Sequence, residues 1–301
     1  MSIGMPNILE NLKKILPDLK ENEVLALYTT FKIGGPAKYF FIAKSNDDVI
    51  KAIKTAKELG INFFILGGGS NILISDKGFN GLVIKMENQK IKINNNIIFT
   101  ESGLPLQKLI RKAIENSLSG LEFCIGIPGT VGGAIAGNTG SPKEWIGQKI
   151  IKVTVLNPEE EIEEIPKSQC DFSYRYSRFK YDDKSIILSG EFQLEKASPT
   201  HIQGLVNEYL EKRKNQPIKY PSAGSIFKNP EGKKAWQLIE EAGLRGKKIG
   251  SAEVSEEHAN FIINTGKAKA DDIVILISYI KQQVRDKLGV QMQEEIKYIG
   301  F

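Results

Sequence analysis

The stretch FFILGGGSNILIS at residues 63–75 says most about the fold of this chain. The apolar run 63–66 predicts a strand, the glycines at 67–69 predict a tight turn, and residues 72–75 predict a second strand. Glycine lets a backbone approach a ligand closely and point several N–H groups at one anion. Because the turn leads into a strand and not into a helix, it is not a strand–turn–helix dinucleotide fingerprint.

A second glycine-rich stretch, GIPGTVGGAIAGN, covers residues 126–138. Neither stretch is a GxxxxGKS or GxxxxGKT phosphate loop, and no strand–turn–helix unit is predicted around the second one. Each stretch alone is equally compatible with tight turns between strands. Together they predict a large phosphate-bearing ligand held along an extended backbone path, and flavin adenine dinucleotide (FAD) fits two separate loops better than a mononucleotide.

Helices and hairpins alternate on both sides of these loops. The predicted helices are 47–59, with Ser45 or Asn46 as its cap and Gly60 as its stop, then 105–118, 200–214 and 271–288. The predicted strands form hairpins at 91–102 and 150–165, with single strands at 185–194 and 290–299. Mixed elements with several hairpins predict an α+β architecture and not a doubly wound sheet.

Composition excludes several classes of function. The length of 301 residues suggests about two domains. The net charge of +5 is mild and its positive residues are spread along the chain, which does not predict a nucleic-acid surface. Cys124 and Cys170 have no metal-ligand spacing and are expected to be reduced, buried thiols. The first residues lack the apolar segment of a secretory signal, and the uncharged run 123–142 has too many glycines to span a membrane.

The segment PSAGSIFKNP at 221–230 combines a hydroxyl (Ser225), an ammonium (Lys228) and a carboxamide (Asn229). Prolines at both ends exclude a regular helix and disfavour a central strand. A stiff loop that presents polar groups suits a site for a charged small molecule. Taken alone, the same segment is also compatible with a solvated loop.

Eight motifs occur in the order found in one known family: TTFKIGGPA (29–37), LGGGSN (66–71), GIPGTVGGAIAGN (126–138), YRYSRFK (174–180), PSAGSIFKNP (221–230), AWQLIEEAGLRG (235–246), VSEEHANFIIN (254–264) and QEEIKYIG (293–300). Over these motifs, from about residue 28 to residue 301, the chain resembles the UDP-N-acetylenolpyruvoylglucosamine reductases. These are flavoenzymes of peptidoglycan precursor synthesis, which serves cell wall biogenesis, cell shape and cell division. The length matches the short type, which lacks the tyrosine-bearing substrate loop.

The resemblance implies an FAD-binding domain of the vanillyl-alcohol-oxidase type over residues 1–197, in two subdomains split near residue 86. A smaller α+β substrate domain follows over residues 198–301. The implied reaction is the NADPH-dependent reduction of UDP-N-acetylglucosamine enolpyruvate to UDP-N-acetylmuramate in the cytoplasm, with FAD as cofactor and no metal. A monomer without a nucleic-acid partner or membrane insertion is expected.

The resemblance also implies roles for individual residues. Arg175 matches the cation that polarises the substrate carboxylate, Ser225 the proton donor and Glu295 the catalytic carboxylate, with Glu294 as its near competitor. On the predicted strand 290–299, Glu295 lies on the other face from the apolar Met292 and Ile296. The same position is expected for an exposed charge on an edge strand. The implied substrate contacts are Tyr174, Lys228, Asn229 and Glu253. The implied cofactor contacts are Ile33, Gly34, Gly67, Gly68, Gly69, Ser70, Asn71, Gly126, Ile127, Pro128, Gly129, Gly132, Gly133, Ala136 and Asn138.

The chain departs from the family pattern in three places. After the second glycine loop it reads NTGSPKEWIG, without the tyrosine that members often carry there. Gln293 stands where Glu is frequent, and Asn215 where a Lys is frequent, so Lys214 is a candidate substitute. Two alternatives remain at this point. One is a related FAD oxidase or dehydrogenase acting on an alcohol or sugar, and the other is a nucleotide-binding module without chemistry.

Overall fold

The computed structural model describes residues 8–141, 143–181 and 185–301. The chain divides into two compact units. Unit 1 comprises the residues up to Glu23, Lys38–Gly68 and Asn80–Glu211, and unit 2 comprises Val24–Ala37, Gly69–Phe79 and Lys212–Phe301. Two N-terminal segments therefore belong to the same unit as the C-terminal part. The division by function into residues 1–197 and 198–301 stays a prediction.

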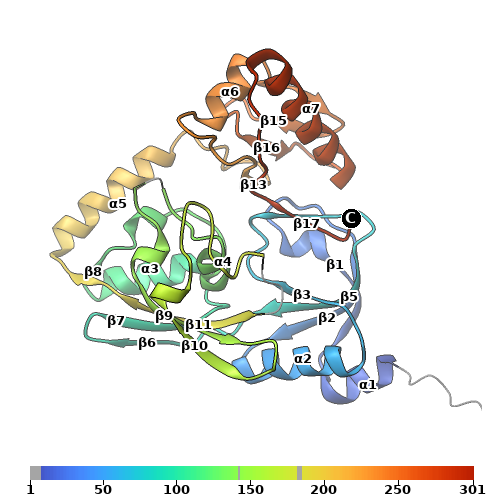
Figure 1. Cartoon of the computed structure of the whole chain (residues 1–301), viewed down its shortest axis with the longest axis vertical. Coiled ribbons are helices and arrows are strands. Elements are labelled where there is room, and N and C mark those ends of the chain that lie inside the picture. The colour runs from blue at the N-terminus through green and yellow to red at the C-terminus, as the bar shows by residue number, and fades with distance from the viewer. Residues whose placement is uncertain (1–7, 142, 182–184) are drawn as a thin grey trace, which may run out of the picture. The chain divides into compact units, whose positions relative to one another are not determined.

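The first sheet of unit 1 has the strand order β1 (Lys20–Val24), β2 (Pro36–Ala43), β5 (Phe79–Met86) and β3 (Phe63–Leu66). Helices α1 (Ile8–Ile15) and α2 (Asn46–Glu58) lie together against one face of it (Figure 1). Of the two caps considered for α2, the structure uses Ser45, whose Oγ accepts a hydrogen bond from Asp48 N while Asp48 returns one to Ser45 N. This capping box fixes where the helix begins.

The two faces of this sheet differ because strand side chains alternate. The core under α1 and α2 takes every second residue of the strands: Tyr39, Phe41, Ala43, Phe63, Ile65, Leu82, Ile84 and Met86. The residues between them, among them Phe40, Leu66, Val83 and Lys85, therefore lie on the face away from these helices. The first glycine loop begins at residue 67, directly after β3.

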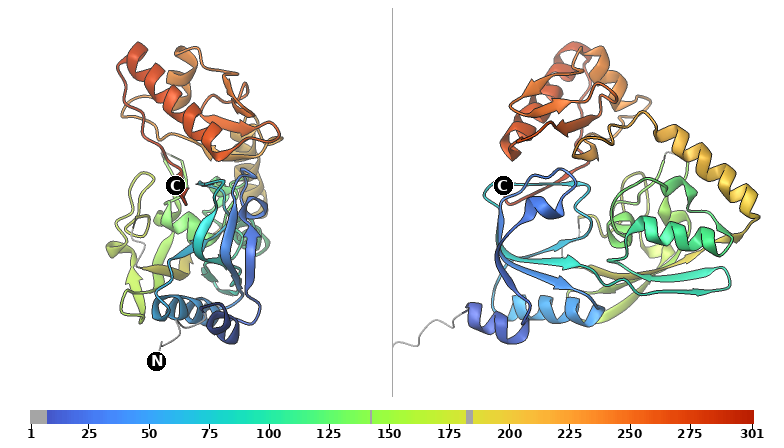
Figure 2. Two further views of the ribbon diagram at one scale, coloured as in Figure 1. Left: turned by 90° about the vertical axis from the view of Figure 1, so that its right-hand side faces the viewer. Right: turned by 180° about the vertical axis from the view of Figure 1, so that it is seen from behind.

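The second sheet of unit 1 is antiparallel, in the order β10 (Ile162–Pro166), β9 (Ile150–Leu156), β11 (Ile186–Gln193), β7 (Ile97–Glu101) and β6 (Ile91–Asn94). Both predicted hairpins are confirmed, at Asn94–Ile97 and at Leu156–Ile162. Helices α3 (Leu106–Glu115) and α4 (Val131–Ala136) share one core with this sheet (Figure 2). The remaining elements here are β8 (Leu118–Ser119), β12 (Glu195–Lys196), α5 (Pro199–Arg213), η2 (Glu122–Cys124), η3 (Ile146–Gln148) and η4 (Lys167–Gln169).

Helix α4 was not predicted, because five of the thirteen residues of the second glycine stretch that contains it are glycine, which is a poor helix former. Two contacts offset the low propensity. Thr130 caps the helix by accepting a hydrogen bond from Gly133 N, and Gly132 N donates to Ser102 O at 2.8 Å. The helix therefore depends on a local cap and on one contact with a distant segment, and not on the helix propensity of its residues.

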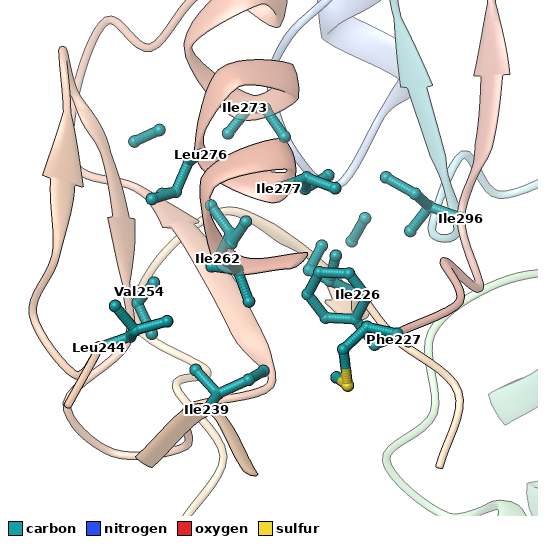
Figure 3. Close-up of a cluster of buried hydrophobic side chains, with 14 of the residues drawn as sticks. Ile226, Phe227, Ile239, Leu244, Val254, Ile262, Ile273, Leu276, Ile277 and Ile296 are labelled. Carbon is teal, nitrogen blue, oxygen red and sulfur yellow. The ribbon is translucent and has the colours of Figure 1, made fainter. Parts of the chain in front are cut away.

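Unit 2 contains the sheet β13 (Ser222–Ser225), β16 (Phe261–Asn264), β15 (Ala252–Val254) and β14 (Lys248–Ile249), with helices α6 (Ala235–Glu241) and α7 (Ala270–Leu288). Figure 3 shows their common core, in which Ile273, Leu276 and Ile277 of α7 meet residues of the strands and of α6. The predicted stop of α7 at Gly289 is confirmed, with φ 66°. Element η1 (Leu25–Tyr28) also belongs to this unit.

The predicted strand 290–299 is wrong over most of its length. Only β17 (Lys297–Ile299) is a strand, and it pairs in parallel with β4 (Ile72–Ile74), more than 200 residues away. Ahead of it, Glu294 forms a single bridge with Phe227, while Met292 and Ile296 enter the core. The apolar residues Met292 and Ile296, whose spacing suggested a strand, therefore reach the core from a segment without regular secondary structure.

Two smaller expectations concern membranes and thiols. No helix among residues 8–141, 143–181 and 185–301 has the length and apolar character to cross a membrane. Cys124 and Cys170 are buried thiols that form no disulfide, as predicted. Burial raises the pKa of Cys170 to about 11, which keeps this thiol protonated and unreactive.

Candidate functional site

The two glycine loops lie against each other in unit 1. A Cβ added at Gly68 would lie 2.5 Å from Gly129 Cα, and one added at Gly67 would lie 2.7 Å from Thr130 Oγ1. Both distances are too short for any side chain, so glycine is required for this contact. The loops therefore form one backbone surface, which is the kind of cradle that a phosphate-bearing group needs.

Two residues that the sequence did not single out hold these loops. Gln107 of α3 donates from Nε2 to Cys124 O (3.0 Å) and Ile127 O (2.7 Å), and its Oε1 accepts from Gly126 N at 3.1 Å. The ammonium of Lys85 donates to Gly67 O at 2.7 Å. Burial lowers the pKa of Lys85. Gln107 thus fixes the start of the second loop and Lys85 the start of the first.

Arg175 sits in a tight turn of unit 1. The turn is closed by two hydrogen bonds between Ser173 and Tyr176, and it leaves Arg175 at φ 55°. Non-glycine residues rarely adopt this left-handed conformation, and such strain often accompanies function. Tyr174, the other central residue of the turn, is 47% exposed.

This turn is tied to the second glycine loop by two buried side chains. Asn138 Nδ2 donates to Ser173 O at 2.7 Å, and Asn138 Oδ1 accepts from Gly147 N at 3.0 Å. Ser177 Oγ donates to Ala136 O at 2.8 Å. The amide of Asn138 therefore has a structural role, and the position of Arg175 depends on the loop predicted to hold the cofactor.

Unit 2 brings Ser225 and Glu295 close together. The segment after Ser225 bonds to the segment around Glu295 through Glu295 N to Ile226 O (2.8 Å) and Lys228 N to Gln293 O (2.9 Å). Asn71, from the first glycine loop, donates from Nδ2 to Glu295 O at 3.3 Å. The predicted hydroxyl, ammonium and carboxylate of this unit thus lie on adjoining strands of backbone.

Asn260 holds the serine segment and was also missed from sequence. Its backbone carbonyl accepts from Ile226 N at 2.8 Å. Its side chain accepts from Phe227 N at 3.0 Å and donates to Phe227 O at 2.8 Å. Strand β13 is an edge strand with an irregular register, in line with the proline argument. Asn260 therefore replaces the ladder hydrogen bonds that such an edge segment lacks.

The structure separates the two candidate carboxylates of the C-terminal motif. Glu294 forms an ion pair with Lys281 of α7 at 2.9 Å. Burial, together with the charge of Glu294, raises the pKa of Tyr298 to about 12. Glu294 is thus engaged in the packing of α7, and the role of Glu295 as the functional carboxylate stays a prediction.

Four predicted contact residues have other roles in the structure. Glu253 pairs with Lys248 at 3.2 Å, and Asn229 Oδ1 accepts from Ala235 N at the start of α6. Ile33 is buried in the core of unit 2, and Gly34 lies against Ile74 with φ 142°. Their substrate and cofactor contacts stay predictions, as do those of Ser70 and Pro128.

The described residues thus form two sets. Unit 1 contains Gly67, Gly68, the second glycine loop and Arg175; unit 2 contains Gly69–Asn71, Ser225, Lys228 and Glu295. The first glycine loop runs from one unit into the other. Within the described part of the chain, no group of three or more His, Cys, Asp or Glu residues could hold a metal ion.

Comparison with known proteins gives two family matches. Residues 37–165 match a model described as FAD binding domain. Residues 216–299 match a model described as UDP-N-acetylenolpyruvoylglucosamine reductase, C-terminal domain. The first match covers both glycine loops but not the Arg175 turn, and the second match covers Ser225 and Glu295.

Curated relatives and a solved structure match over nearly the full length. The chain is 43% identical to the UDP-N-acetylenolpyruvoylglucosamine reductase of Caldicellulosiruptor saccharolyticus over 96% of this chain and 94% of the relative. It is 42% identical to that of Carboxydothermus hydrogenoformans over 97% of both chains. The crystal structure of the Thermus caldophilus enzyme superposes with a TM-score of 0.82 at 31% identity, covering 93% of this chain and 99% of the other.

Proposed function

The chain belongs to the UDP-N-acetylenolpyruvoylglucosamine reductase family of FAD-dependent oxidoreductases, and from this premise we propose its reaction and mechanism. The proposed reaction is the reduction of UDP-N-acetylglucosamine enolpyruvate to UDP-N-acetylmuramate, with NADPH as reductant. Because this product is a peptidoglycan precursor, the proposed compartment is the cytoplasm. We propose a monomer as the active species.

The glycine loops of unit 1 fit an FAD molecule. Gly67 and Gly68 meet Gly129 and Thr130 with no room for side chains, and this leaves backbone to line the surface. In the proposal these loops, with Gly69–Asn71, hold the dinucleotide. When bound, FAD supplies the transfer of a hydride from NADPH to the vinyl carbon of the substrate.

Arg175 and Ser225 act on the enolpyruvyl group of the substrate. The guanidinium of Arg175 offers a rigid fork of donors that suits the carboxylate, and this interaction polarises the double bond. Reduction at the terminal carbon leaves the adjacent carbon strongly basic. A serine hydroxyl is a weak acid and can protonate only such a centre, so we assign this proton to Ser225.

Glu295 and the remaining polar groups position the substrate. The backbone of Glu295 is held beside Ile226, one residue from Ser225. In the proposal its carboxylate orients the Ser225 hydroxyl. Lys228 supplies a point charge for the diphosphate, and Asn229, Tyr174 and Glu253 are proposed contacts of the sugar or nucleotide. Lys214 is the candidate for the phosphate contact that Asn215 cannot make.

The hydrogen bond from Glu295 N to Ile226 O carries this proposal, because it brings two motifs distant in sequence to one place. The test is a visible spectrum of the purified protein under anaerobic conditions. We expect flavin absorbance that NADPH bleaches and that UDP-N-acetylglucosamine enolpyruvate restores. A colourless protein, or a reduced flavin that the enolpyruvyl substrate does not reoxidise, would refute the proposed reaction.

A further inference from the structure

Lys85 is a charged side chain at the junction of the two glycine loops. It lies on β5, where it is the register partner of Leu66, the last residue of β3 before Gly67. Its Nζ donates to Gly67 O at 2.7 Å. The ammonium is therefore one residue from Gly68, which contacts Gly129 of the second loop.

The ammonium of Lys85 has no carboxylate within ion-pair distance among the described residues. The charge of Glu87 partly offsets the effect of burial on the pKa of Lys85, but Glu87 forms no ion pair with this lysine. An ammonium has three N–H donors, of which Gly67 O takes one. Burial lowers the pKa of this lysine, so the surroundings disfavour the charge in the absence of an anion. Partly buried charges are normally paired or serve a ligand.

The side chain also lies on the face of the sheet opposite α1 and α2, where it is partly exposed. Residues Leu82, Ile84 and Met86 of β5 enter the core under α1 and α2. Lys85 alternates with them and points to the opposite face, where the first glycine loop begins. An anion that lies on the loop backbone would therefore meet this ammonium and replace the missing counter-charge.

We propose that Lys85 binds the diphosphate of the dinucleotide cofactor from beneath the first glycine loop. This inference deepens the proposed function, because it rests on FAD being the ligand of these loops. It assigns Lys85 to the phosphates and not to the flavin ring. Its removal therefore weakens ligands that carry the diphosphate and leaves ligands that lack it unaffected.

The test compares FAD with riboflavin, which has the same ring system and no phosphate. The full-length protein is freed of flavin, and dissociation constants are measured by quenching of flavin fluorescence for the native protein, Lys85→Met and Lys85→Arg. Losing a charge-assisted hydrogen bond should weaken FAD roughly 10- to 100-fold in Lys85→Met. Riboflavin should bind all three proteins within about 2-fold of each other, and Lys85→Arg should recover most of the FAD affinity.

Lys38→Met is the matched control, because Lys38 is an exposed lysine on β2 of the same sheet. It should leave both dissociation constants unchanged. An equal loss of FAD and riboflavin in Lys85→Met would show that the lysine only braces the loop, and an unchanged FAD affinity would also overturn the inference. If Lys85→Met does not fold, Lys85→Gln takes its place under the same criteria. A native protein that binds no FAD would refute the proposed function itself.

Discussion

The contact between the two glycine loops leads to a sharp prediction for Gly68→Ala. The new Cβ would lie 2.5 Å from Gly129 Cα, 3.0 Å from Gly129 C and 3.3 Å from Thr130 N, all of them backbone atoms. Carbon atoms pack at about 3.5 Å or more, so the loops would have to separate by about 1 Å. Overpacking of this kind costs roughly 1–3 kcal/mol of unfolding free energy.

The same displacement should weaken FAD binding. A shift of about 1 Å takes backbone N–H donors out of hydrogen-bond range of the phosphates, and each charge-assisted bond lost is worth at least tenfold in affinity. The assays are urea unfolding followed by tryptophan fluorescence and FAD titration by fluorescence quenching. We expect a lower urea midpoint and a dissociation constant for FAD raised at least about 10-fold.

Gly204→Ala is the matched control for this substitution. Gly204 lies inside α5, and nothing lies within 4 Å of its Cβ position. Alanine there should stabilise the helix by up to about 1 kcal/mol and leave FAD binding unchanged. If Gly68→Ala bound FAD and unfolded like the native protein, the two loops would not be in the contact described. The proposal that they form one cofactor-binding surface would then be refuted.

Three further predictions address other parts of the molecule. Lys228→Met should raise the KM for the UDP substrate about 10-fold with little change in kcat, whereas a fall in kcat alone would place Lys228 elsewhere in the mechanism. Ser177→Ala removes the hydrogen bond to Ala136 O and should lower the free energy of unfolding by roughly 1–2 kcal/mol. It should also lower kcat while the dissociation constant for FAD stays native. Full activity of this variant would show that the bond does not position Arg175. Burial lowers the pKa of His258 below its usual 6.5, so its contribution to stability is present above pH 6.5 and lost as the pH falls further. His258→Gln should therefore flatten the fall of the urea midpoint between neutral and acid pH, and an unchanged slope would refute this assignment.

Local patterns in the sequence predicted most elements of the fold. The cap at Ser45 and the stop at Gly289 mark helix ends by chemistry that acts within a few residues, so α2 and α7 could be placed closely. The hairpins followed from alternation and turn residues. The α+β class is confirmed by the FAD binding domain match and by the Thermus caldophilus structure.

Long-range contacts explain what the sequence could not predict. Strand β17 is short because its partner is β4, and the residues ahead of it bond to the serine segment instead of forming a ladder. Helix α4 forms among poor helix formers because its first turn also donates from Gly132 N to Ser102 O, thirty residues earlier in the chain. Neither the β17–β4 pairing nor the contact with Ser102 has a local signal.

The same limit applies to the supporting residues of the site. Gln107, Asn260 and Lys85 act on carbonyl and N–H groups far away in the chain, so their residue types alone carried no signal. The motifs did predict the loops and the serine segment. The ion pair of Glu294 with Lys281 of α7 likewise joins distant parts of the chain and has no local signal.

The role of Ser225 is tested most directly by separating the two halves of the reaction in Ser225→Ala. In anaerobic stopped-flow experiments, NADPH should bleach the flavin of this variant at the native rate, since no proton from Ser225 is needed for that step. Reoxidation by the enolpyruvyl substrate should then be slower by several orders of magnitude. A variant whose flavin recovers its colour as fast as that of the native protein would contradict the assignment of the proton to this hydroxyl.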